Sequence, residues 1–142
     1  MPKIKINLPD KFLFSTEMDV RVDDINYAGH LGNDSVLTLV HEARIRFFKS
    51  LGFTEKDAGG HGIIMSDAAI AFRSEGFHGD KLTVQIGIGN FEKYRFELFY
   101  LFTQKDTGKE VARVSTGIVF FDYQNRKICK MPEAFANKTG LI

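Results

Sequence analysis

The chain has 142 residues, a length that predicts one domain over residues 1–142 with room for a substantial core. Its 19 basic and 18 acidic residues leave a formal net charge of +1, which argues against a general nucleic-acid or membrane-surface binder. No apolar run approaches the roughly 18–20 residues that span a bilayer, so we expect no membrane insertion. The single cysteine, Cys129, and the lack of a secretory signal favour the reducing cytoplasm.

The first part of the chain predicts an arm followed by a strand. Residues 1–13 contain two prolines and no sustained period, so we expect a short strand or arm and then a turn. Residues 14–22 alternate between apolar and charged side chains, which indicates a half-buried strand.

A Gly-broken loop over residues 23–33 then leads into the only long helical pattern. Gly29 and Gly32 give this loop backbone freedom, and Asn33 or Asp34 is a good helix N-cap residue. Polar side chains and backbone N–H groups therefore converge at the positive end of a helix. Such a place suits an oxyanion or a polarised carbonyl.

The helical pattern covers residues 35–51, and Gly52 is well placed to end it. One broad arc of this helix is apolar, and it contains Val36, Leu37, Leu39, Val40, Ala43, Phe47, Phe48 and Leu51. Arg44 projects into that arc, where an unpaired charge is strongly destabilising. We expect Asp24, in the preceding loop, to be its salt-bridge partner.

Strand patterns fill the second half of the chain. We expect four strands, at residues 63–73, 81–91, 94–103 and 110–122. The last two are apolar on both faces, which is typical of central strands. Short hairpin-like links, at residues 79–80, 90–93, 105–108 and 123–126, indicate antiparallel pairing. The predicted fold is α+β, with a curved antiparallel sheet of about five strands around one long central helix.

Residues 21–33 contain Arg21, Asp24, Gly29, His30 and Asn33, which match an R-x-x-D-x-D-x-x-G-H-x-N-N-like loop. This loop and the helix after it resemble those of the hot-dog-fold acyl-CoA thioesterases, in the 4-hydroxybenzoyl-CoA thioesterase-like family. Shorter matches follow in the family's order, namely Glu42-Ala43-Arg44, Leu51-Gly52, Gly79-Asp80 and Pro132. The resemblance implies a hot-dog fold, thioester hydrolysis, and CoA as part of the substrate with no separate cofactor. It also implies a homodimer, with a homotetramer possible, that binds CoA between subunits.

One position departs from the family pattern. The second Asp of the family loop, usually the base or nucleophile, is Asn26 here. An amide cannot take a proton, but it can donate a hydrogen bond to a carbonyl oxygen. Some hot-dog thioesterases carry the acid on the helix. By that analogy Asn26 polarises the thioester carbonyl, the N–H of Gly29 or His30 completes the oxyanion site, and Asp34 or Glu42 activates water.

These considerations define a candidate site. The predicted catalytic residues are Asn26, His30, Asp34 and Glu42, and the predicted substrate-binding residues are Gly29, Asn33 and Asp24. Arg44 and Asp24 form the expected structural salt bridge. No His, Cys or acidic residues have metal-ligand spacing, so we expect no metal. The CoA phosphates need a cation at the mouth of the site, for which the candidates are Arg73, Lys81 and Lys93.

Three functions remain open. The first is an acyl-CoA thioesterase for a small or medium acyl group. The second is an acyl-CoA hydratase or dehydratase on the same fold, whose D-x-N-P-x-H loop is similar to Asp24, Asn26 and His30 but has a Pro and one residue fewer. The third is a non-catalytic acyl-CoA binding protein, which the replacement of the usual acid by Asn26 would explain. Acyl-chain identity and the choice between CoA and carrier-protein esters stay open.

Overall fold

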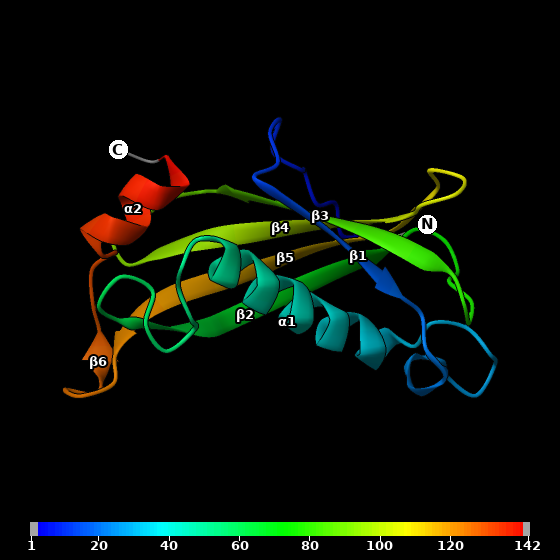
Figure 1. Ribbon diagram of the computed structural model, residues 1–142, viewed down its shortest axis with the longest axis horizontal. Helices are drawn as coiled ribbons and strands as arrows, with labels where there is room; N and C mark the ends of the chain where they lie inside the picture. The colour runs from blue at the N-terminus through cyan, green and yellow to red at the C-terminus, as the bar shows by residue number, and fades with distance from the viewer. Residues whose placement is uncertain (1–2, 141–142) are drawn as a thin grey trace.

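The computed structural model describes residues 3–140, so residues 1–2 and 141–142 of the predicted domain lie outside the described part of the chain. An antiparallel sheet in the order β1-β3-β4-β5-β2, with β6 pairing β5, curves around one long helix (Figure 1). The strands are β1 Phe14–Asp19, β2 Gly62–Phe72, β3 Lys81–Gly89, β4 Arg95–Gln104, β5 Glu110–Asp122 and β6 Lys127–Ile128. The helix is α1, Asn33–Ser50. The predicted architecture of a curved sheet around a central helix is confirmed.

The helix begins earlier than predicted. Gly32 is the N-cap residue and no side chain caps the helix, so the prediction of Asn33 or Asp34 as N-cap is wrong. Both residues instead occupy the first helical turn, because the chain already turns into the helix at Gly32. A Cβ on Gly32 would lie only 2.8 Å from Oδ1 of Asp34. At the other end, Gly52 adopts a φ of 83° directly after the last turn, as predicted.

The core lies between α1 and the concave face of the sheet. The apolar arc of α1 is buried at Val36, Leu39, Val40, Ala43, Phe47 and Phe48. It meets alternate residues of the central strands, among them Phe96, Leu98, Tyr100, Phe102, Val114, Ile118 and Phe120. Each such Phe or Leu contributes roughly 1.5–3 kcal/mol when it leaves water. Strands β4 and β5 have neighbours on both sides, which confirms that they are central.

The salt bridge predicted between Arg44 and Asp24 is wrong. The Nε atom of Arg44 lies 2.6 Å from Oε2 of Glu55, and its Nη1 donates to the hydroxyl of Tyr100 at 3.4 Å. The carboxylate of Asp24 is buried and accepts the backbone N–H of Arg21 at 2.8 Å. This contact closes a short 3-10 turn, η1 Val22–Asp24, so the strand β1 ends before residue 22. The buried phenol of Tyr100 has a raised pKa because burial disfavours its charged form.

The topology corrects one predicted hairpin. Residues 79–80 do not join two paired strands, because β2 pairs with β5 while β3 pairs with β1 and β4. The segment between β2 and β3 therefore connects the edge strand β2 to β3, which lies next to the opposite edge strand, β1. The remaining three predicted hairpins are present. A second helix, α2 Glu133–Thr139, was not predicted, and it buries Phe135 against the core.

The N-terminal segment crosses the face of the sheet opposite α1. The described residues of the predicted arm form no strand. Ile6 packs with Ala71 and Phe99 in a small second core. Further along, Pro9 lies close against Gly87, where a Cβ would approach the proline ring to 2.5 Å. Within residues 3–140, none of the helices is both long enough and apolar enough to cross a bilayer.

Candidate active site

The loop before α1 is held in one conformation by its own hydrogen bonds. The N–H of Asn26 donates to the carbonyl of His30 at 2.7 Å, and the N–H of Gly29 donates to the carbonyl of Asn26 at 3.0 Å. Gly29 has a φ of 81°, a conformation that favours glycine. The side-chain oxygen of Asn26 accepts the N–H groups of Ala28, at 3.0 Å, and His30, at 3.2 Å. The side-chain NH₂ of Asn26 is therefore the group that the loop can offer to a ligand.

The predicted oxyanion donors are already occupied. The N–H groups of Gly29 and His30 both donate within the loop, to the carbonyl and to the side-chain oxygen of Asn26 respectively. The first turn of α1 supplies the alternative. Its N–H groups have no partner within the helix, and among residues 3–140 no side chain caps them. The positive end of the helix dipole lies at the same place.

The loop is joined to the segment that follows β2. The N–H of Leu31 donates to the carbonyl of Gly76 at 2.7 Å, and His30 pairs with Phe77 in an isolated antiparallel bridge. Nε2 of His30 lies 3.6 Å from Oε2 of Glu75, and the His30 and Phe77 rings pack nearly perpendicular to each other, with centroids 5.2 Å apart. The close approach requires a small residue at Gly76, where a Cβ would lie 3.1 Å from Cβ of Leu31.

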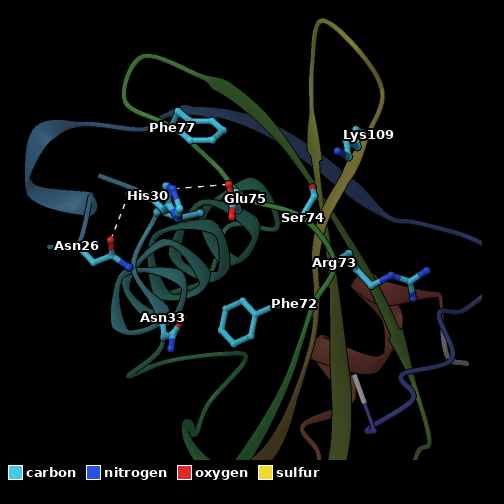
Figure 2. Close-up of a pocket in the computed structure, with 10 residues that line it drawn as sticks. Asn26, His30, Asn33, Phe72, Arg73, Ser74, Glu75, Phe77 and Lys109 are labelled. Carbon is cyan, nitrogen blue, oxygen red and sulfur yellow. Dashed lines mark hydrogen bonds and ion pairs between the residues drawn. The ribbon is translucent and has the colours of Figure 1, made fainter. Parts of the chain in front are cut away.

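A cavity of about 570 Å³ opens between these two segments (Figure 2). It is lined by Asn26, His30, Leu31, Asn33, Phe72, Arg73, Ser74, Glu75, Phe77 and Lys109. Figure 2 shows Phe72 pointing from the end of β2 toward the side of Asn33 and the helix, while Glu75 points toward His30. Polar groups capable of proton transfer and hydrogen bonding therefore face aromatic side chains across one cavity, which is the usual composition of a small-molecule site.

Part of the predicted site is brought together by the fold and part is not. Asn26, His30 and Asn33 line the cavity. Asp24 is buried beneath the loop, and Gly29 and Asp34 do not line the cavity, although the Asp34 carboxylate lies close to Gly32. Glu42 lines a different cavity, of about 450 Å³, and its Oε2 lies 2.6 Å from Nε of Arg46.

Of the three predicted phosphate-binding cations, one lines the cavity. This is Arg73. Lys81 lies elsewhere and contacts Oδ1 of Asp19 at 3.0 Å, and Lys93 lies 5.5 Å from the centre of the Tyr94 ring. Only Arg73 is therefore placed to contact a molecule bound in this cavity. Within residues 3–140, no three His, Cys, Asp or Glu side chains are grouped as a metal ion would require.

The sequence did not predict that the cavity would be lined by Phe72, at the end of β2, by Ser74, Glu75 and Phe77, which follow β2, and by Lys109. The sequence gives one signal, a polar run from Arg73 to Glu75 between a strand pattern and Gly76. That run becomes part of the site only because Leu31 and His30 pair with residues 76–77. Such a long-range bridge leaves no periodic pattern in the sequence.

The model of the thioesterase-like superfamily matches residues 20–139 of the chain, which include the whole loop, α1 and every strand of the sheet except β1. The chain belongs to the thioesterase-like superfamily. The predicted family is thus confirmed over most of the chain. A comparison with curated proteins found no match.

Solved structures share the fold at low sequence identity. A 1,4-dihydroxy-2-naphthoyl-CoA thioesterase from Synechocystis has a TM-score of 0.81 and 24% identity, over 89% of this chain and 95% of that one. A hypothetical protein from Staphylococcus aureus in complex with CoA has a TM-score of 0.82 and 21% identity, over 96% and 87%. A gentisyl-coenzyme A thioesterase has a TM-score of 0.76 and 18% identity, over 89% and 99%. The predicted hot-dog fold is confirmed.

Proposed function

We propose that this superfamily member is an acyl-CoA thioesterase that hydrolyses its substrate in the cavity between the loop before α1 and the segment after β2. One observation carries the proposal, namely that Asn26, His30 and Glu75 line the same cavity at the uncapped end of α1. The superfamily match supports thioester hydrolysis as the reaction. The structural neighbours named as CoA thioesterases support an acyl-CoA as the substrate.

In the proposed mechanism each of these groups has one role. The side-chain NH₂ of Asn26 and the first N–H groups of α1 donate hydrogen bonds to the thioester carbonyl oxygen. These donors stabilise the negative charge that develops on this oxygen, and each such donor is worth roughly 10²–10³ in rate. His30 accepts a proton from a water molecule, whose oxygen attacks the carbonyl carbon. The C–S bond then breaks, and the leaving thiolate takes the proton from the imidazolium.

In the proposed mechanism Glu75 orients the His30 ring and faces the imidazolium that forms during the reaction. The separation of 3.6 Å between Nε2 of His30 and Oε2 of Glu75 is slightly longer than a hydrogen bond. Contacts of this kind shorten when a substrate fills the site. General acid–base catalysis by such a pair contributes roughly 10²–10⁴ in rate. In this mechanism His30 activates the water, which is the role that the sequence assigned to Asp34 or Glu42, and Glu75 is the acid beside His30 in the cavity.

The lining of the cavity favours a small or medium acyl group. Phe72, Phe77 and Leu31 supply an apolar wall beside the polar groups. Aromatic side chains of this kind accept an aliphatic or an aromatic acyl chain. Two of the structural neighbours carry names that specify aromatic acyl-CoA substrates, which supports testing aromatic acyl groups first.

The outer edge of β2 supports a homodimer. β2 is the last strand of the sheet on one side, and Ile64 and Met65 are exposed there. An exposed edge of this length invites pairing with another strand, and two copies of β2 in antiparallel register would join two sheets. Met65→Lys is expected to shift the mass measured by light scattering from dimer to monomer. A wild-type monomer would contradict the dimer, and a wild-type tetramer would mean that two such dimers associate.

A cytoplasmic location is also part of this proposal, because Cys129 is the only cysteine.

The experiment that tests the activity is a thiol-release assay over a panel of acyl-CoA esters. Wild-type protein is expected to release CoA thiol, and Asn26→Ala and His30→Ala are expected to lose most of this activity. Hydrolysis that neither substitution affects would refute the site. Loss of the conjugated double bond of an enoyl-CoA without thiol release would favour a hydratase. Binding of acyl-CoA by calorimetry with no turnover would favour a non-catalytic binding protein.

A further inference from the structure

A second cavity continues from the first around the end of β2. It has a volume of about 440 Å³ and is lined by Ile4, Lys5, Ile6, Asn7, Ala71, Phe72, Arg73 and Arg113. Phe72 and Arg73 line both cavities, so the two share a wall. Neighbouring residues of a strand point to opposite faces. Figure 2 accordingly shows Phe72 pointing toward the side of the helix, and Arg73 pointing away from Asn26 and His30.

Positive charge is concentrated in this second cavity. Lys5, Arg73 and Arg113 line it, and Glu110 is the carboxylate that pairs with both arginines. Arg113 donates to both Glu110 oxygens, at 2.9 and 3.3 Å, and also donates to the carbonyl of Ile6 at 3.1 Å. Arg73 is held more loosely, because its Nε lies 3.7 Å from Glu110 and its side chain is 44% exposed. Three cations therefore line the cavity, and one carboxylate pairs with two of them.

The N-terminal segment that supplies Lys5 is fixed in place. Ile6 is 7% exposed and packs on Ala71 and Phe99, and its carbonyl is held by Arg113. Lys5 is thus held beside the cavity by the burial of its neighbour. This segment lies outside residues 20–139, the part of the chain that matches the superfamily model. The second cavity is therefore completed by residues that the superfamily match does not include.

We propose that the second cavity binds the phosphates at the nucleotide end of CoA, with Lys5 and Arg73 as the contacting cations and Arg113 holding the N-terminal segment in position. The inference rests on the proposed function, because it takes the thioester to be in the first cavity. The pantetheine arm then passes the shared wall at Phe72 and Arg73. The far end of CoA carries a pyrophosphate and a 3′-phosphate, which cationic side chains bind by charge-assisted hydrogen bonds. A carrier-protein ester has a single phosphodiester and makes fewer of these contacts.

The test compares two thioesters of one acyl group. Acyl-CoA carries the phosphates, and the corresponding N-acetylcysteamine thioester lacks them. For Lys5→Gln and Arg73→Gln, the ratio of kcat/KM for acyl-CoA to kcat/KM for the short thioester is expected to fall about tenfold, through KM. Lys11→Gln is the matched control, because Lys11 is an exposed cation of the same segment that does not line the cavity. The acyl-phosphopantetheine ester, which lacks the nucleotide, is expected to resemble the short thioester.

A second measurement does not depend on turnover. Titration of wild-type protein with adenosine 3′,5′-bisphosphate in a calorimeter is expected to show binding that Lys5→Gln and Arg73→Gln weaken about tenfold and Lys11→Gln does not. Equal binding by all four proteins, or no binding by wild type, would overturn the site. A protein that hydrolyses neither thioester yet shows this pattern would refute the proposed function and leave the phosphate site supported.

Discussion

Nε2 of His30 lies 3.6 Å from Oε2 of Glu75, although one residue belongs to the loop before α1 and the other to the segment after β2. The two segments are joined by the backbone hydrogen bond from Leu31 to Gly76. A carboxylate beside an imidazole fixes the ring and stabilises its protonated form. In the proposed mechanism the pair serves as the general base, although the residue at the family's usual acid position is Asn26.

Glu75→Gln is expected to lower kcat for acyl-CoA hydrolysis by about 10- to 100-fold, because the amide cannot stabilise a protonated His30. Glu42→Gln is the matched control, since Glu42 is also exposed but lines another cavity. We expect its kcat to stay within about twofold of wild type. The measurement is thiol release under saturating substrate. A loss confined to Asp34→Asn or Glu42→Gln would place the base on the helix instead.

Asn26→Asp restores the residue type that the family usually carries, and we nevertheless expect it to lower kcat by about 10²-fold. The side-chain oxygen already accepts the N–H groups of Ala28 and His30, so the loop conformation should survive. The NH₂ donor is lost, and a negative oxygen then faces the thioester carbonyl. Circular dichroism checks the fold and thiol release measures the rate. A faster enzyme would show that this position works best as an acid.

Glu55→Gln is expected to lower the free energy of unfolding by about 2–4 kcal/mol, because it leaves the buried Arg44 without its carboxylate. This value is set below the roughly 3–5 kcal/mol for a fully buried pair, because the Glu55 side chain is 25% exposed. Breaking the exposed pair of Arg46 with Glu42 by Glu42→Gln should cost less than about 0.5 kcal/mol. Urea unfolding measures both. Similar losses in the two variants would mean that the Arg44 contact is no stronger than a surface pair.

Asp67 gives a prediction for acid stability. The Ser66 hydroxyl and Arg95 lower the pKa of this carboxyl below its ordinary value of 3.8. A lowered pKa means that the carboxylate stabilises the fold above the unfolded pKa, and that this contribution disappears as the pH falls through the folded pKa. Asp67→Asn should therefore have a lower Tm than wild type at about pH 6, and the difference should vanish toward about pH 2. A difference in Tm that does not change with pH would contradict this.

Much of the fold could be predicted because the relevant signals are local. The apolar arc of α1 and the two-sided strands β4 and β5 have periods that fix which residues face the core. The glycine at position 52 marks the end of the helix. The errors concern which elements become neighbours. Periodicity could not show that β2 pairs with β5. It also could not show that Arg44 forms its ion pair with Glu55 and not with Asp24.

The site, like the fold, could be predicted only where the signals are local. Asn26, His30 and Asn33 could be predicted because they share one short loop with a recognisable pattern. Glu75 could not, because its position beside His30 depends on a bridge between distant segments. The N–H groups of Gly29 and His30, which the sequence predicted as oxyanion donors, instead donate hydrogen bonds to Asn26 within the loop. The side-chain oxygen of Asn26 accepts the N–H of His30.

A double-mutant cycle tests most directly whether His30 and Glu75 work as one catalytic unit. It requires kcat/KM for acyl-CoA hydrolysis by wild type, His30→Ala, Glu75→Gln and the double variant. Because Glu75 is proposed to act only through His30, the double variant should be no slower than His30→Ala alone. If the two losses multiply in the double variant, the residues act independently and the proposed pair is wrong.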